Sequence, residues 1–240
     1  MLIKVYQINP DVSEDARFAV FSGMERLPNG KVNPAHYQRV FVGDLTGCKN
    51  LEDVFVRFNT GRVPTLQGHS LSVSDVVEIL ENDDNGNLKG FYFCDSIGWK
   101  RIDFDPSLAA ESNTFKESIR VVYIRPGCRP VVTNIWKKLG YLQDAVSMSG
   151  EESLIEFMYP FSGDMDHMIL VGNEEAALIN MPFTFGGEDP TPLNQIFTMY
   201  GGFQGPVFVT RDSGEDDGEL TSLTDEDIKK LEKVFGTVIK

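Results

Sequence analysis

Four short stretches of the sequence combine residue types that can do chemistry. The first begins like a calcium-binding loop, with Glu81, Asp83, Asn85 and Gly86 at its first, third, fifth and sixth positions. The twelfth position, which needs a bidentate glutamate, is Tyr92. The stretch therefore favours a hairpin-like connection that turns at Asn85-Gly86 over a calcium site.

The second stretch, Asp164-Met-Asp-His167, carries two carboxylates and an imidazole that could bind a metal ion. A metal site needs three or four ligands that converge, and one local trio does not establish convergence, so a solvated loop is favoured. The third, Cys94-Asp95-Ser96, lacks the glycine frame of a nucleophile elbow. Asp95 and Ser96 are expected to organise a turn by bonding backbone amides.

The fourth stretch, Gly201-Gly-Phe-Gln-Gly205, lacks the lysine of a phosphate loop and the spacing of a dinucleotide loop, so an irregular loop is expected. The sequence therefore predicts no catalytic residue, no cofactor and no metal. Residues that are brought together only across a fold leave no local motif, so an enzyme stays open.

The charge of the chain is strongly negative and unevenly placed. The net charge is −14; residues 1 to 110 hold 11 basic and 15 acidic side chains, and residues 111 to 240 hold 11 and 21. Between Lys138 and Lys229 one base, Arg211, stands against 18 acids. Such a surface repels nucleic acid, so direct binding to nucleic acid is not expected. A basic protein surface is a better partner.

The acids of the second half suggest an interaction surface. Its candidate residues are Glu174, Glu175, Asp212, Glu215, Asp216, Asp217 and Glu219. If the acids share one face, that face could imitate nucleic acid and occupy a DNA-binding host protein. If they are dispersed over loops, they keep the chain soluble.

Residues 90 to 106 are the packing centre expected in the first half. Phe91 and Phe93 lead to a bend at Ser96–Gly98, and Trp99 follows on a second strand. Phe93 is expected to be buried. A helix from residue 73 to 80, capped by Ser72, is expected to supply Val76 and Val77 to the same core.

Other elements follow from periodicity and capping residues. In the first half, strands are expected at 2–10, 18–21 and 39–42, and a helix at 51–59 capped by Asn50. In the second half, the pattern predicts strands at 118–126, 154–159, 167–172, 176–179 and 206–210, and helices at 134–146 and from Thr224 to Gly236.

The domain organisation follows from these elements and from an internal echo. Ile3-Lys-Val and Ile119-Arg-Val each open an apolar run that ends in proline. The sequence predicts an α+β protein with two small α+β domains, each opening with a β-strand, joined by a short linker. The boundaries are 1–106, a linker at 107–117, and an acidic domain at 118–240.

The compartment is expected to be the cytoplasm. The three cysteines are widely spaced, without a Cys-x-x-Cys pair, as in reduced proteins. The sequence has no run of 18 apolar residues and its first residues lack the pattern of a signal peptide, so no membrane span and no secretion are expected.

The first half resembles the YodL-like domain family. The resemblance rests on Ile3-Lys-Val-Tyr-Gln-Ile-Asn-Pro10, Asn50-Leu-Glu-Asp-Val-Phe55, Ser70-Leu-Ser-Val-Ser-Asp-Val-Val77 and Phe91-Tyr-Phe-Cys-Asp-Ser-Ile-Gly98. The second half resembles a domain of unknown function, through Ile119-Arg-Val, Pro126-Gly127, Gly172-Asn-Glu-Glu175 and Leu223-Thr-Asp-Glu226. Both families are common in phages, plasmids and integrative elements of Firmicutes. The resemblance implies a protein of a mobile genetic element, proposed to counter host defence, and it carries over no catalytic residues.

Two functions follow as hypotheses. The first is a non-enzymatic protein of a mobile element that binds and modulates a host protein. The second is a small-molecule-binding protein or an enzyme with a pocket under residues 181–205, because long loops without their own secondary structure are often functional.

Overall fold

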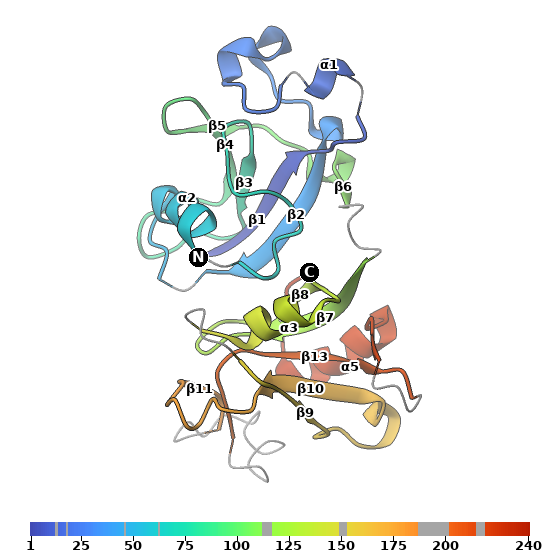
Figure 1. Cartoon of the computed structure of the whole chain (residues 1–240). Helices are drawn as coiled ribbons and strands as arrows, with labels where there is room; N and C mark the ends of the chain where they lie inside the picture. The colour runs from blue at the N-terminus through green and yellow to red at the C-terminus, as the bar shows by residue number, and fades with distance from the viewer. Residues whose placement is uncertain are drawn as a thin grey trace. The chain divides into compact units, whose positions relative to one another are not determined.

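The computed structural model divides the chain into two compact units, Met1–Thr114 and Phe115–Lys240 (Figure 1). It describes residues 1–12, 14–17, 19–45, 47–61, 63–111, 117–148, 153–186, 202–214 and 219–240. Each unit combines helices with a sheet and opens with a β-strand. The predicted fold class, two small α+β domains joined by a short linker, is therefore confirmed.

The first unit is built on one six-stranded sheet in the order β5-β4-β3-β1-β2-β6. The strands are β1 (Leu2–Ile8), β2 (Tyr37–Asp44), β3 (Val76–Ile79), β4 (Gly90–Cys94), β5 (Trp99–Ile102) and β6 (Ala110–Glu111), and the helices are α1 (Glu14–Arg17) and α2 (Leu51–Thr60). All neighbouring strands run antiparallel except β2 and β6, which run parallel. Because β6 joins this sheet, part of the expected linker 107–117 is an ordered element of the first unit; residues 112–116 lie outside the described residues.

The two faces of this sheet are buried by different segments. Ile3 and Val5 of β1 pack with Val54 and Phe58 of α2 on one face. Tyr6 and Ile8 of β1 face the opposite side, where the segment between α1 and β2 covers a second cluster that includes Phe93. This alternation is the period of two expected for strands with both faces covered.

The second unit is a five-stranded antiparallel sheet in the order β8-β7-β13-β10-β9, with β14 paired to β13. Its strands are β7 (Ser118–Ile124), β8 (Val131–Trp136), β9 (Ile155–Met158), β10 (Met168–Asn173), β13 (Val207–Asp212) and β14 (Leu220–Thr221). A two-stranded piece joins β11 (Phe183–Phe185) to β12 (Phe203–Gln204), and the helices are α3 (Leu139–Val146) and α5 (Asp225–Phe235).

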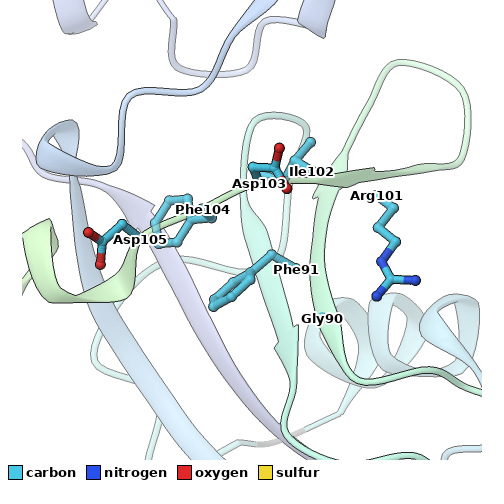
Figure 2. A pocket seen from close by; sticks show the side chains of 7 residues that line it. All are labelled: Gly90, Phe91, Arg101, Ile102, Asp103, Phe104 and Asp105. Carbon is cyan, nitrogen blue, oxygen red and sulfur yellow. The ribbon is translucent and has the colours of Figure 1, made fainter.

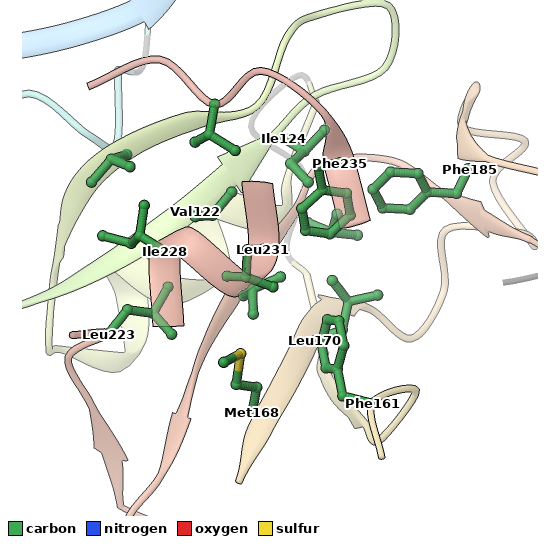
Figure 3. Packing of buried hydrophobic residues seen from close by; sticks show 14 of the residues in the cluster. Val122, Ile124, Phe161, Met168, Leu170, Phe185, Leu223, Ile228, Leu231 and Phe235 are labelled. Carbon is green, nitrogen blue, oxygen red and sulfur yellow. The ribbon is translucent and has the colours of Figure 1, made fainter. Parts of the chain in front are cut away.

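One helix covers each face of the second sheet. On one face, Ile228, Leu231 and Phe235 of α5 pack onto Leu170 and its neighbours, and the ring of Phe235 stacks on Phe185 at 5.6 Å (Figure 3). On the other face, α3 packs with the alternate residues of β7, β10 and β13. Among the described residues the longest helix, α5, has 11 residues, and none has the length and apolar character needed to cross a bilayer.

The helix expected from residue 73 to 80 is wrong, because this segment is a turn followed by β3. The Ser72 amide does donate to the Asp75 carboxylate at 2.8 Å, but this bond closes a tight turn. Ser74 in that turn has a φ of +82°, which a right-handed helix cannot contain. Val76 and Val77 then point to opposite faces of the sheet.

Three further expectations need correction. The helix expected at 134–146 begins only at Leu139, because Ile135 pairs with Ile119 in β8. The strand expected at 176–179 is a series of turns, which the Asn173 side chain starts by accepting the Glu175 amide at 2.9 Å. Residues 19–21 of the strand expected at 18–21 also form turns, and Phe18 lies outside the described residues.

Two of the three helices predicted from capping residues are confirmed. Asn50 caps α2 by accepting the Asp53 amide at 2.9 Å. Thr224 and Asp227 form the complete reciprocal capping box of α5, and Gly236 ends that helix. Local capping chemistry was therefore sufficient to place these two elements.

We expect the two units to fold independently, because each has its own buried apolar clusters. Fragments 1–111 and 117–240, expressed separately, should each unfold in one cooperative thermal transition. The first fragment keeps β6 and the 2.8 Å ion pair between Arg39 and Glu111. A fragment that ends at residue 106 lacks both and should therefore melt at a lower temperature than fragment 1–111. Two fragments that aggregate without cooperative transitions would refute independent folding.

Candidate functional site

The stretch that resembles a calcium loop is organised by one carboxylate. Asp83 accepts the backbone amides of Asn85 and Asn87, each at 3.0 Å, and also the side-chain amide of Asn87. These hydrogen bonds, led by that of the Asn87 side chain, lower the pKa of Asp83. The carboxylate that sequence analysis considered as a ligand thus closes the turn between β3 and β4.

The Asp164 carboxylate and the His167 imidazole of Asp164-Met-Asp-His167 are directed toward α5. Asp164 lies 3.2 Å from the Nζ atom of Lys230, and His167 Nε2 lies 2.9 Å from the Asp227 carboxylate. In the described parts of the chain, no three histidine, cysteine or acidic side chains are grouped so that they could hold a metal ion. This segment therefore joins the start of β10 to the helix.

Cys94 and Asp95 have separate structural roles. Burial raises the pKa of the Cys94 thiol to about 12, which disfavours the thiolate that a nucleophile requires. Asp95 accepts the amides of Ser96 and Met24 and pairs with Lys100, so it fixes the β4–β5 turn as expected. All three cysteines of the chain are thiols.

The glycine-rich stretch contributes to the core of the second unit. Gly202 has a φ of +88°, and a β-carbon there would lie 2.5 Å from the carbonyl oxygen of Phe185. This close approach lets Phe203 pair with Phe185 in the small β11–β12 sheet. Residues 187–201, which include most of the loop expected to cover a pocket, lie outside the described residues.

The candidate acidic residues fall into two groups at opposite ends of β10. Glu174 and Glu175 follow its last residue, whereas Asp212 lies beside its start, where the Asp212 amide donates to the His167 carbonyl at 3.0 Å. Six residues of extended strand separate these ends by about 17 Å. Glu219 lies with Asp212 and pairs with Lys137. Glu215, Asp216 and Asp217 lie outside the described residues.

A cleft of about 490 Å³ opens at the edge of the first sheet (Figure 2). It is lined by Gly90, Phe91, Arg101, Ile102, Asp103, Phe104 and Asp105. Its apolar base is formed by the rings of Phe91 and Phe104, whose centroids are 5.3 Å apart. Tyr6 supports the Phe104 ring from beneath, at 5.1 Å. The cleft thus has a rigid aromatic base on a buried cluster.

The charged groups of this cleft are arranged asymmetrically. The Arg101 guanidinium extends away from the aromatic rings and donates to the Lys89 carbonyl at 2.9 Å (Figure 2). It lies against Gly90, where a β-carbon would come within 3.1 Å of it. Asp105, at the other end, accepts the amide and hydroxyl of Ser107, which lower its pKa. Carboxylates therefore dominate the aromatic end of the cleft.

A buried polar network lies elsewhere in the first unit. The Asp75 carboxylate, which is almost inaccessible, accepts the side-chain amide of Gln7 at 2.9 Å and the backbone amide of Ser72 at 2.8 Å. Gln7 also bonds to both backbone groups of His69, so it ties β1 to the segment before β3. Burial raises the pKa of Asp75 to about 8 despite these hydrogen bonds.

This network predicts a pH dependence for the first unit. The folded pKa of Asp75 lies above the unfolded value of about 3.9. The contribution of Asp75 to stability is therefore complete below pH of about 4 and is lost as pH rises through about 8. Urea titrations from pH 4 to 9 should show this decline in the wild type and a flatter profile in Asp75→Asn. Equal slopes for the two proteins would contradict the assignment to Asp75.

The sequence pattern of residues 90 to 106 predicts a packing centre and does not predict the cleft. Within that stretch Arg101, Asp103 and Asp105 alternate with apolar residues, and this alternation is the signal of a strand with one charged side. These residues lie at the edge of the sheet because β5 pairs with β4. The pairing was expected, but the cleft that it creates was not.

Comparison with known proteins identifies both halves of the chain. Residues 2–104 match the YodL-like domain, and residues 119–236 match a domain of unknown function (DUF3846). No curated protein and no solved structure matches the chain. The predicted resemblances and their order are thus confirmed, and the chain consists of a YodL-like domain followed by a DUF3846 domain.

Proposed function

We propose that this chain is a cytoplasmic binding protein of a mobile genetic element, which acts on a host protein by binding it and not by catalysis. The observation that carries the proposal is the cleft beside β5, the terminal strand of the first sheet among the described residues, with an aromatic base and a charged rim. Exposed sheet edges beside apolar pockets are a recurrent mode of binding protein segments. The mobile-element context rests on the resemblance of both domains, and the counter-defence role is part of the same proposal.

The acids of the second unit favour a basic partner without defining one contact face. The net charge of −14 attracts basic surfaces over several ångströms. However, the described candidate acids lie at two ends of β10, and Glu219 is paired with Lys137. Because the acids are dispersed, they support long-range attraction of a basic partner better than they support imitation of nucleic acid. DNA-binding host proteins therefore enter the test as one class of partner.

The proposal is tested by affinity capture with the full chain from a Firmicute lysate, followed by titration of each purified candidate. We expect at least one host protein to bind saturably, and to bind more weakly as salt increases. A partner that contacts the acids near Asp212 should lose affinity for Asp212→Lys, with Glu174→Lys as a matched control at the other end of β10.

Two outcomes would overturn this function. One is the failure of every captured protein to bind the purified chain. The other is turnover of a small molecule that is abolished by a substitution in the cleft, because it would make the cleft an active site. Competition of DNA with a bound partner would support imitation of nucleic acid, and binding without competition would exclude it.

A further inference from the structure

We infer that the outer edge of β5 binds an extended peptide segment of a partner protein, which adds a strand to the first sheet and places a basic side chain beside Asp103 and Asp105. This inference rests on the proposed function and specifies its binding mode. Its evidence comes from the hydrogen-bonding pattern of β5, the cleft beside that strand, and the charges at the end of the cleft.

The hydrogen-bonding pattern leaves one side of β5 unused by its neighbour. The Asp95 amide donates to the Gly98 carbonyl at 3.0 Å, so the next pair, Cys94 with Trp99, is not hydrogen-bonded. The backbone groups of Cys94 confirm this assignment, because they point away from β5 and bond to Ser74 and Asp75. Along the alternating ladder, Lys100 and Ile102 then bond to β4.

The backbone groups of Trp99 and Arg101 consequently point away from the sheet. Among the described residues, β5 is the last strand at its end of the sheet. Outward-pointing amide and carbonyl groups two residues apart are the template to which an added strand bonds. An extended segment can therefore pair with Trp99, Arg101 and the chain that follows.

The cleft supplies a place for a side chain of the added segment. Ile102 pairs with Phe91, so these two side chains lie on the same face as Phe104. A segment lying along β5 would direct alternate side chains toward this apolar base. The cleft volume of about 490 Å³ accommodates one large apolar side chain.

Charge selects the partner. Asp103 and Asp105 follow the end of β5, and both line the cleft. Both residues are exposed, and a lysine or arginine of the added segment can pair with them.

The test compares two substitutions of Arg101 that both remove its side chain and differ in whether the outward backbone amide is kept. Arg101→Pro deletes an amide that does not bond to β4, so an edge strand tolerates it. Arg101→Ala removes the same side chain and retains the amide. Short random peptides displayed on phage are selected on the full chain, and the synthetic peptide that binds best is titrated against each variant.

We expect the selected peptides to alternate basic and apolar residues. Their affinity should fall about tenfold or more in Arg101→Pro and stay within about threefold in Arg101→Ala. Replacing both Asp103 and Asp105 by asparagine should weaken binding and reduce its dependence on salt. Peptides without basic residues, or equal affinity for Arg101→Pro and Arg101→Ala, would overturn the inference.

Two controls distinguish a loss of stability from a loss of peptide binding. Lys100→Pro, whose amide bonds to β4, should lower the melting temperature, whereas Arg101→Pro should melt close to Arg101→Ala. If Arg101→Pro does not fold, the test is hydrogen exchange of the Trp99 and Arg101 amides in the wild type. A bound peptide must slow the exchange of both amides. A host partner that binds Arg101→Pro normally would overturn the edge site and leave the proposed function intact.

Discussion

Replacing Phe93 by alanine should lower the free energy of unfolding of the first unit by about 3 to 5 kcal/mol. Phe93 has no exposed surface and packs with Tyr6, Val76 and Phe104 on the face opposite α2. Deleting the ring removes its contacts and leaves a cavity that strands on both sides cannot close. Chemical denaturation, followed by the fluorescence of Trp99, measures the change.

The matched control for Phe93 lies in the same hairpin. Ile97, at the β4–β5 turn, is 92% exposed, so Ile97→Ala should change stability by less than about 0.5 kcal/mol. An unchanged denaturation midpoint for Phe93→Ala would mean that Phe93 faces solvent. The register of β4 would then be shifted by one residue, which would also invalidate the assignment of outward amides on β5.

Replacing Asp227 by alanine should destabilise the second unit by about 2 to 4 kcal/mol. The Asp227 carboxylate accepts the Thr224 amide and hydroxyl at 2.8 and 2.7 Å and pairs with Arg211 at 2.7 Å. His167 lies 2.9 Å from its other oxygen. The substitution removes one half of the capping box of α5, namely the bond to the Thr224 amide, and leaves Arg211 and His167 without their common partner. Because these two side chains are partly exposed, water limits the loss.

The control is another acid in the same helix turn. Asp225 is exposed and pairs with Arg120 at 2.7 Å, so Asp225→Ala should cost less than about 1 kcal/mol. Denaturation is followed by the fluorescence of Trp136, which belongs to the second unit. Equal losses for Asp225→Ala and Asp227→Ala would contradict a special role for the buried carboxylate.

Asp227 also predicts a pH dependence opposite to that of Asp75. Burial raises the pKa of Asp227, but hydrogen bonds from His167, Thr224 and Arg211 outweigh burial and hold the pKa below its ordinary value. Its contribution to stability is therefore complete above the unfolded pKa of about 3.9 and is lost as pH falls toward the folded pKa. Acid should thus destabilise the second unit, and Asp227→Asn should reduce that effect.

The sequence predicts those elements whose local capping residues and apolar pattern fit only one secondary structure. The capping box at Thr224 and Asp227 can be satisfied only by a helix start when an amphipathic pattern follows it. At Ser72 and Asp75 the same pair of side chains closes a turn, because Ser74 adopts a left-handed conformation and the valines that follow are needed in a sheet. That choice is made by tertiary pairing with β1 and β4, which no local pattern contains.

The candidate site was less predictable than the fold. Arg211 stood out in the sequence as a lone base, but only the pairing of β13 with β10 and β14 brings it to Asp227. The cleft depends in the same way on where the chain turns after Ile102. A free edge can be identified only when the strand order is known, since every strand has the same local signature.

Hydrogen exchange of the β5 amides tests the central claim most directly. In the free protein, the amides of Trp99 and Arg101 should exchange rapidly and those of Lys100 and Ile102 slowly, because only the latter bond to β4. Addition of a bound partner segment should slow the exchange of Trp99 and Arg101 and leave Lys100 and Ile102 unchanged. Slow exchange of Arg101 in the free protein, or rapid exchange of Arg101 in a saturated complex, would contradict strand addition at this edge.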